Sequence, residues 1–126
     1  MVVFNADWCP ACQNMGERWN MFGHWCKDRC KGATCKHVKV GRVDITVSPF
    51  LTGRVMISNL PTIFHIKDGI WRDYGNKKRQ TNNLRDFVKH KKWENIEPIY
   101  WLDPGKDVFR QMDGTEKKLH IGAFPL

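Results

Sequence analysis

The sequence opens with MVVFNADWCPACQNM, residues 1 to 15, in which a short apolar run leads into two cysteines three positions apart. The β-branched apolar run at residues 1 to 4 predicts a buried strand. Cys9 then stands where a helix N-cap is expected, and Pro10 stands at the first helical position, where a missing N–H leaves no bond unmade. The stretch therefore predicts a strand that turns directly into a helix, with the cysteine pair at the junction.

An apolar stripe at helical spacing follows the pair and predicts a helix of about five turns. Gly32 is expected to break this helix. The stripe is formed by Ala11, Met15, Trp19, Phe22 and Cys26.

Hydrophobic spacing and turn residues predict further elements downstream. They are a strand at residues 37 to 45, a short helix opening at Ser48, strands at residues 62 to 66 and 70 to 74 joined by the turn KDG, and a helix capped by Thr81. The order β-α-β-α-β-β-α predicts an α/β fold with a mixed four-strand sheet and helices on both faces. Strands separated by a helix are expected to run parallel, and the hairpin strands antiparallel.

The patterning weakens towards the end of the chain. We therefore expect one domain over residues 1 to 105 and an irregular polar tail over residues 106 to 126. No run approaches the roughly 18 apolar residues that a membrane span requires, and the first residues have neither the basic region nor the long apolar region of a signal peptide.

The chain is basic, with a formal net charge of +8. Basic side chains cluster at residues 76 to 79 and 89 to 92, and we interpret both clusters as solvated surface. No nucleic-acid-binding motif accompanies them, so no nucleic acid partner is expected.

The cysteine pair allows three interpretations. A helix N-terminus favours an anion, so Cys9 could act as a thiolate nucleophile, and Cys12, one turn along, could attack a mixed disulfide formed at Cys9. The pair could also be half of a zinc site, although no second CxxC or CxxH completes a zinc ribbon. Finally, the two cysteines could be ordinary thiols.

The chain has five cysteines, so at least one is unpaired within a monomer. The cysteines outside the pair are interpreted as core or loop thiols or an accidental disulfide, and only secondarily as a metal site. The residues concerned are Cys26, Cys30, Cys35 and, for a metal, His37.

Two motifs together resemble a known family. WCPAC at residues 8 to 12, after an apolar strand, and LPT at residues 60 to 62, before a strand and hairpin, resemble the thioredoxin fold. The segment KKWENIEPIYWLDPG, residues 91 to 105, is similar to the thioredoxin-related transmembrane branch of the protein disulfide isomerase family. The resemblance covers residues 1 to about 105.

The resemblance implies a minimal thioredoxin fold and a thiol–disulfide oxidoreductase that acts on protein clients. No cofactor and no metal are implied, and a monomer is expected. Members of this branch reside in the endoplasmic reticulum and carry a membrane anchor, and neither an entry signal nor an anchor is visible in this sequence.

The resemblance also assigns roles around the pair. Cys9 would be the exposed nucleophile and Cys12 the buried resolving cysteine, while Trp8 would flank and shield them. Pro10 and Ala11 lie between the cysteines without the histidine of the commonest isomerase motif, which favours a more reducing couple.

Two further residues receive roles from the resemblance alone. Pro61 would be a cis-proline that faces the cysteines, where its loop pairs with an extended client peptide. Arg79 matches an arginine that lowers the pKa of the resolving thiol in disulfide isomerases.

The sequence also departs from the family pattern. The sixth position before Cys9 is usually a buried acid that relays a proton to and from the resolving cysteine, and here it is Val3. The family has a strand and a helix before this first strand, so the sequence is interpreted as N-terminally truncated, with reduced stability. These departures favour an alternative: a catalytically weak module that binds clients or partners.

Overall fold

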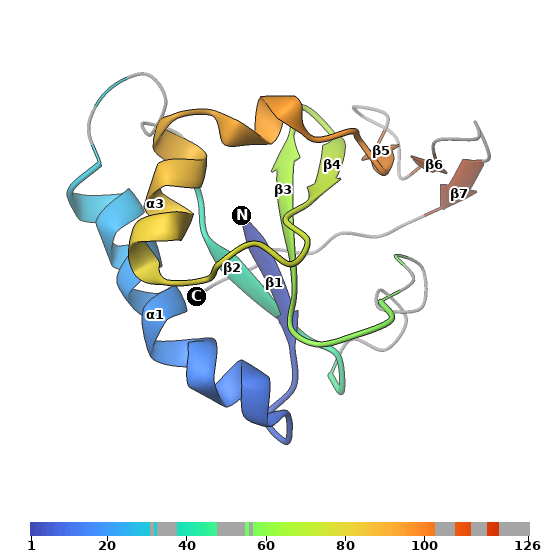
Figure 1. Ribbon diagram of the computed structural model, residues 1–126. Helices are drawn as coiled ribbons and strands as arrows, with labels where there is room; N and C mark the ends of the chain where they lie inside the picture. Colours follow the sequence, from blue (N-terminus) through green and yellow to red (C-terminus); the bar gives the residue numbers. More distant parts are fainter. Residues whose placement is uncertain are drawn as a thin grey trace.

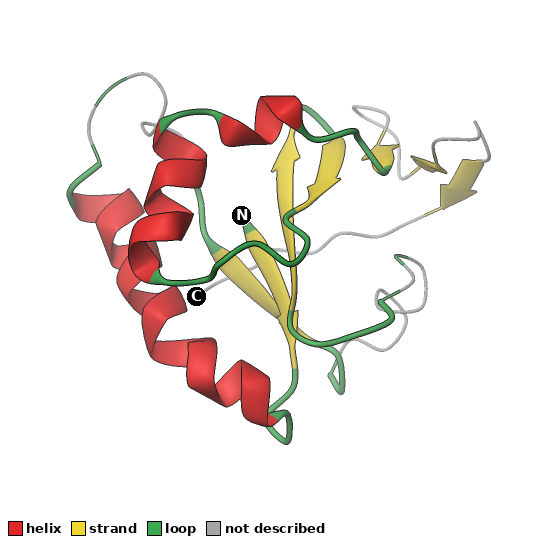
Figure 2. Ribbon diagram, in the orientation of Figure 1, coloured by secondary structure: helices red, strands yellow, loops and turns green. Residues whose placement is uncertain are grey.

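The computed structural model describes residues 1–30, 32, 38–47, 55, 57–102, 108–111 and 116–118. Its elements are β1 (Val2–Asn5), α1 (Pro10–Asp28), β2 (Gly41–Asp44), β3 (Thr62–Lys67), β4 (Ile70–Asp73), α3 (Thr81–Lys89), the 3-10 helix η1 (Lys92–Asn95), β5 (Tyr100–Leu102), β6 (Val108–Gln111) and β7 (Glu116–Lys118). Figure 1 shows their arrangement and Figure 2 distinguishes the helices from the sheet.

The strands form one sheet in the order β2-β1-β3-β4-β5-β6-β7. Its first four strands are the mixed sheet that the sequence predicts, with β1 parallel to β2 and β3 antiparallel to β4. The first strand of the chain is therefore central, bonded on both sides, which suits its apolar sequence because both of its faces are covered.

The direction of β3 differs from the expectation. β3 runs antiparallel to β1, and Thr62 pairs with Phe4 at the end of the sheet where β2 finishes. The chain between β2 and β3 therefore returns to the same end of the sheet instead of crossing its length. The expectation that β3 runs parallel to the strands before it is therefore wrong. The connection starts and ends at the same end of the sheet, so β3 runs back in the opposite direction.

The tail also differs from the expectation. The weak patterning after residue 105 predicts irregular structure, but residues 108–111 and 116–118 form β6 and β7, which extend the sheet through β5. Strand pairing uses backbone N–H and C=O groups, so it does not require a regular side-chain pattern.

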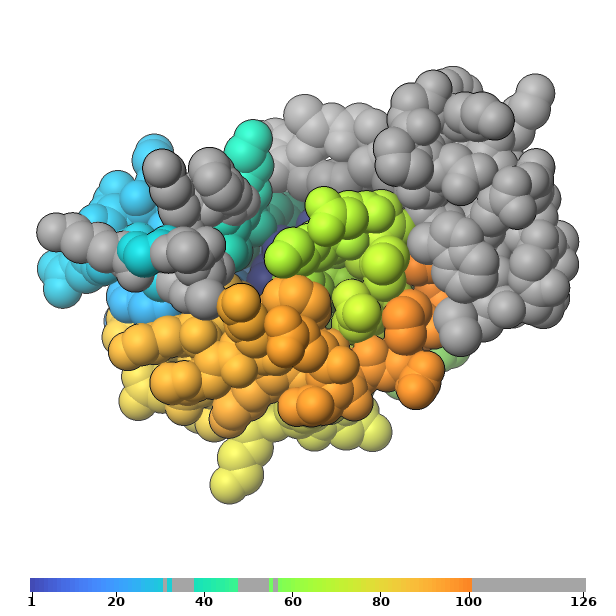
Figure 3. Space-filling model, turned by 90° about the horizontal axis from the view of Figure 1, so that it is seen from above, coloured from blue at the N-terminus to red at the C-terminus, as the bar shows by residue number. Residues whose placement is uncertain are grey.

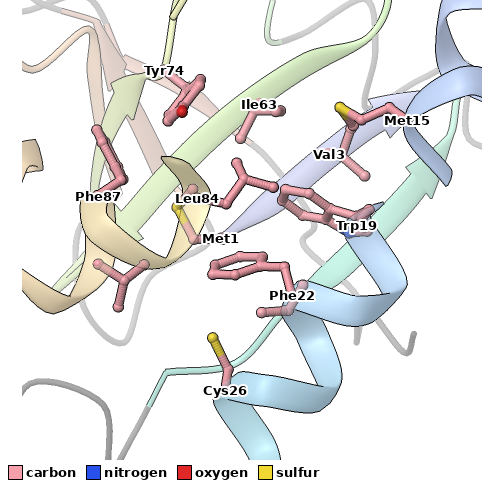
Figure 4. Close-up of a cluster of buried hydrophobic side chains, with 12 residues drawn as sticks. Met1, Val3, Met15, Trp19, Phe22, Cys26, Ile63, Tyr74, Leu84 and Phe87 are labelled. Atoms are coloured by element: carbon pink, nitrogen blue, oxygen red, sulfur yellow. The ribbon is translucent and has the colours of Figure 1, made fainter. Parts of the chain in front are cut away.

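The described helices α1 and α3 lie side by side on one face of the sheet (Figure 1). Apolar side chains from both helices and from β1 point toward one another there (Figure 4). Helices on both faces are predicted, but the predicted helix opening at Ser48 lies outside the described residues. The main core of the domain is this cluster, which includes Val3, Met15, Trp19, Phe22, Ile63, Leu84 and Phe87.

The start of the chain is part of the same core. Met1 is 6% exposed, and its ammonium group donates a hydrogen bond to the carbonyl oxygen of Lys39 at 2.9 Å. In Figure 3 the first residues, in dark blue, show only in a recess between the β3–β4 hairpin and the segment after α3. Burial lowers the pKa of this ammonium group to about 6.

The connection after α3 is held to the sheet by an aromatic stack. The ring of Trp93 lies 4.4 Å from the ring of His65, with 11° between the planes. Burial lowers the pKa of His65 to about 3, so this imidazole is neutral at physiological pH and stacks as an uncharged ring. Arg72 lies over the Trp93 ring and donates a hydrogen bond to the Ile96 carbonyl at 3.0 Å.

Two neighbouring residues of α1 differ in burial, and this difference allows the packing of the core to be tested. Phe22 is fully buried, whereas Met21, the preceding residue, is 51% exposed. Phe22→Ala is expected to lower the free energy of unfolding by about 3–5 kcal/mol, because it removes the apolar contacts and leaves a cavity. Met21→Ala, the matched control, should change it by less than about 0.5 kcal/mol. Urea unfolding measures both values, and equal losses would contradict the packing described here.

Candidate redox site

Three strand ends converge on the cysteine pair. Ala6 follows β1, Ile45 follows β2, and Leu60 precedes β3. These side chains pack with Cys9 and Cys12 into a small apolar cluster. The N–H of Ile45 donates to the Asn5 carbonyl at 3.0 Å, which fixes the end of β2 beside the end of β1.

Cys9 is the N-cap of α1, as the sequence predicts. Its backbone is extended, with φ −87° and ψ 113°, and Pro10 takes the first helical position. The Sγ atom of Cys9 accepts a hydrogen bond from the Cys12 N–H at 3.2 Å. The first turn of a helix leaves backbone N–H groups without helical partners, so this contact places a sulfur where a negative charge is stabilised.

The expected difference in exposure between the two thiols is not found. Cys9 is 6% exposed and Cys12 is 5% exposed. Both are covered by the same cluster of strand-end residues. Trp8 flanks the pair as expected, but 65% of its surface is open to solvent, and Pro10 and Ala11 are exposed on the first turn of α1.

The Cys12 thiol is held in its protonated form. Burial and a hydrogen bond with Cys9 raise the pKa of Cys12 from 9.0 to about 11. A buried thiol resists ionisation because its charged form would lose the solvation that water gives. Cys12 therefore has to give up a proton before it can act as a nucleophile.

The Leu60–Pro61 peptide bond is cis, as the resemblance implies. The guanidinium group of Arg79 donates to the carbonyl oxygens of Pro61, at 2.9 Å, and of Gly75, at 3.0 Å. Arg79 thus links the loop before β3 to the loop after β4 through two hydrogen bonds. The causes of the raised pKa of Cys12 do not include Arg79, so its action on that thiol stays a prediction.

Val3 is 1% exposed and belongs to the main core, on the face of β1 that α1 covers. Its neighbours in this core are apolar, and they include Met15 and Trp19 of α1 (Figure 4). No carboxylate therefore lies at the position from which the family pattern relays a proton.

The other cysteines separate into two kinds. Cys26 is a free thiol within the main core, and burial raises its pKa to about 11. Cys30 is disulfide-bonded. Among the residues that the structure describes, no group of three or more histidine, cysteine, aspartate or glutamate side chains could hold a metal ion. Cys35 and His37 lie outside the described residues.

The sequence pattern does not reveal which residues surround the cysteine pair. Ile45 reads as an ordinary strand residue, and Leu60 only as part of the LPT motif. The feature that could have identified Ile45 and Leu60 is their position at the ends of strands. Residues at one edge of a sheet meet even when they are distant in sequence. A hollow lined by Asn59, Asn76 and Lys77 lies next to Leu60 and is also missed.

This arrangement defines a class of protein. A dithiol at the junction of a central strand and a helix, with a cis-proline loop beside it, is the site of a thioredoxin-like domain. The sequence profile of the thioredoxin family matches residues 1–90. The chain belongs to the thioredoxin family.

Within the thioredoxin family, the chain is similar to thioredoxin-related transmembrane proteins. The chain is 40% identical over 113 residues to thioredoxin-related transmembrane protein 1 of Bos taurus and 39% identical to that of Homo sapiens. It is 34% identical over 115 residues to thioredoxin-related transmembrane protein 4 of Mus musculus. The matches cover 89%, 89% and 90% of this chain but only 38%, 38% and 32% of the relatives. None of the described helices has the length and apolar character to cross a membrane.

Solved structures show the same fold. The zinc-bound form of human ERp44 matches with a TM-score of 0.63 and 26% identity, over 72% of this chain and 25% of that chain. The first two thioredoxin domains of Saccharomyces cerevisiae Eps1p match with a TM-score of 0.63 and 18% identity, over 71% of this chain and 33% of that one.

The buried Cys12 thiol predicts a loss of stability at alkaline pH in the reduced protein. Its pKa is raised from 9.0 to about 11, so the folded state holds the proton more tightly than the unfolded state. This stabilisation is complete below pH 9 and is lost as the pH rises through about 11. Urea titrations across this window should show a steeper decline for the wild type than for Cys12→Ser, whose hydroxyl does not titrate there. Parallel profiles would contradict the protonated state assigned to Cys12.

Proposed function

We propose that this chain is a thiol–disulfide oxidoreductase that exchanges disulfides with client proteins. Cys9 is the nucleophile and Cys12 the resolving cysteine. The observation that carries the proposal is the hydrogen bond from the Cys12 N–H to the Cys9 Sγ at the N-terminus of α1. It stabilises negative charge on one sulfur and keeps the second thiol one helical turn away.

In the reductive direction, the Cys9 thiolate attacks one sulfur of a client disulfide. A Cys9–client disulfide forms, and the other client sulfur leaves as a thiolate that takes up a proton. Cys12 then loses its proton and attacks the Cys9 sulfur, which forms the Cys9–Cys12 disulfide and releases the second client thiol. Two electrons pass from the dithiol to the client. The reverse sequence oxidises a client.

The relatives support the proposal and its setting. The curated relatives are thioredoxin-related transmembrane proteins, and we extend the family's endoplasmic reticulum location to this chain. The disulfide at Cys30 is in accord with that compartment, because structural disulfides persist where the environment is oxidising. Protein clients are the partners, and we expect a monomer.

One observation favours a second function. Val3 belongs to the apolar core, no carboxylate is buried among the residues that the structure describes, and the pKa of Cys12 is raised to about 11. A slow resolving step would leave the client attached to Cys9. The chain would then hold clients as long-lived mixed disulfides and act as a binding module with little turnover.

Trapping experiments distinguish the roles of the two cysteines. Reduced wild-type chain is expected to reduce insulin, and Cys9→Ser to be inactive, because the attacking sulfur is gone. Cys12→Ser should accumulate a mixed disulfide with insulin that dithiothreitol releases, measured by mass spectrometry under non-reducing conditions. If the wild type does not reduce insulin and Cys12→Ser forms no mixed disulfide, the proposed oxidoreductase activity is wrong. Trapping by the wild type without turnover would support the binding module.

Substitution of Val3 tests the missing proton relay. Val3→Glu is expected to accelerate the resolving step by about 10²-fold at neutral pH, the lower end for a positioned acid–base group. Val3→Gln is the matched control, because it has nearly the same size and polarity but no titratable proton. Rapid mixing follows release of the client from the Cys9 mixed disulfide. Equal rates for the Glu and Gln variants would mean that proton transfer does not limit this step.

A further inference from the structure

A hollow of about 360 Å³ lies beside the cis-proline loop. The loop before β3 forms one wall and the loop after β4 forms the other. Its lining residues are Asn59, Leu60, Pro61, Asn76, Lys77 and Arg79. Nothing in the redox chemistry proposed above uses this hollow.

The polar lining consists of groups that can donate hydrogen bonds. Arg79 has five N–H groups. Two of them bond to the Pro61 and Gly75 carbonyls, and the other three have no partner among the described residues. Lys77 Nζ donates to the Tyr74 carbonyl oxygen at 3.2 Å and lies 5.9 Å from the centre of the Tyr74 ring, and its other ammonium protons have no hydrogen-bond partner in the described part of the chain.

The amide side chains add donors. The Oδ1 atom of Asn59 lies 3.3 Å from the Thr62 hydroxyl, so its acceptor side faces β3 and its NH2 group keeps no partner in the described part of the chain. The side chain of Asn76 is exposed and likewise makes no hydrogen bond to a described residue. None of the described residues that line this hollow is acidic.

One acidic residue lines the adjoining hollow, of about 240 Å³, which shares Asn59, Asn76 and Arg79 with the first. It is Asp73, whose Oδ1 atom accepts the Gly75 N–H at 2.7 Å. This carboxylate is therefore bonded within its own loop. The first hollow keeps two cations and two amides with nothing of opposite charge among its lining residues.

The hollow adjoins the redox site through one residue. Leu60 lines the hollow and also packs against the cluster that contains Cys9 and Cys12. The hollow and the cysteine cluster therefore share one side chain. An extended chain advances about 3.3 Å per residue, so the client residues considered for the hollow are those one or two positions from the client cysteine.

We propose that this hollow is a subsite for a carboxylate side chain of the client, and that it selects clients with aspartate or glutamate next to the reactive cysteine. The inference rests on the proposed disulfide exchange and adds a substrate preference to it. The cations and amide donors of the subsite hold the carboxylate while Cys9 attacks.

The test uses two synthetic peptides that differ only in charge. Each contains one cysteine as a mixed disulfide with 2-mercaptoethanol, which carries no other charged group and leaves as a thiolate that takes up a proton. This cysteine is flanked by glutamates in one peptide and by glutamines in the other. Single-turnover reduction by the reduced chain should be about three- to fivefold faster for the glutamate peptide at low ionic strength, the range of exposed ion pairs. The ratio should fall toward one at about 1 M salt, where the screening length is about 3 Å.

Two charge-matched variants locate the effect. Lys77→Gln removes one cation from the hollow and should lower the glutamate-to-glutamine rate ratio. Lys89→Gln removes the same charge from an exposed position on α3 that does not line the hollow, and the ratio should stay at its wild-type value. A wild-type ratio of one, or an equal decrease in both variants, would overturn the subsite.

A binding experiment is independent of turnover. Serine analogues of the two peptides cannot exchange disulfides, and their binding can be followed by the NMR signals of the Asn59 and Asn76 side-chain amides. The glutamate analogue is expected to shift these signals and to bind about threefold more tightly. Equal affinities would overturn the subsite. If neither disulfide peptide is reduced, the proposed oxidoreductase fails, and this binding comparison alone decides the subsite.

Discussion

The hydrogen bond from the Cys12 N–H to the Cys9 sulfur joins the architecture of the domain to its chemistry. A side-chain acceptor at the N-cap stabilises the start of a helix, and here the acceptor is the sulfur proposed to attack a disulfide. The contact depends on both neighbouring elements. Strand β1, bonded on both sides, fixes where the helix begins, and the buried face of α1 fixes how it lies on the sheet. A change that loosens either element would move the sulfur away from its donor.

The packing of the core and the proposed chemistry place opposing demands on the position of Val3. Val3 fills a position in the main core, where an apolar side chain adds packing and a carboxylate would lose solvation. The proton acceptor that the family pattern has at this position would replace that packing. The burial that raises the pKa of Cys12 also covers Cys9, since both thiols share one cluster. Burial thus favours the protonated, reduced dithiol and opposes ionisation of Cys12 in the proposed resolving step.

The sequence could predict those features that short stretches of chain determine. The N-cap and first-turn proline of α1 depend on adjacent residues, and the turn of the β3–β4 hairpin depends on Asp68 and Gly69, which both have positive φ. The sequence could not predict features that depend on contacts between distant residues, such as the direction of β3 and the pairing of β6 with β5. The expected apolar stripe of α1 is wrong at its first residue, because Cys12 is buried and Ala11 is exposed. Contacts with the residues at the strand ends determine which side of the first turn is covered.

Arg79 shows why the site could be predicted only in part. The resemblance supplies an arginine that acts on the resolving thiol, but the structure shows it bonded to the carbonyls of Pro61 and Gly75. A movement of the guanidinium group toward Cys12 that breaks these two bonds would leave two carbonyl oxygens to find other donors. The hydrogen bonds that hold Arg79 at the wall of the hollow therefore oppose its movement toward the thiol. A ligand carboxylate bound to its free N–H groups would strengthen that opposition, because it would add a charge-assisted bond that also has to be broken.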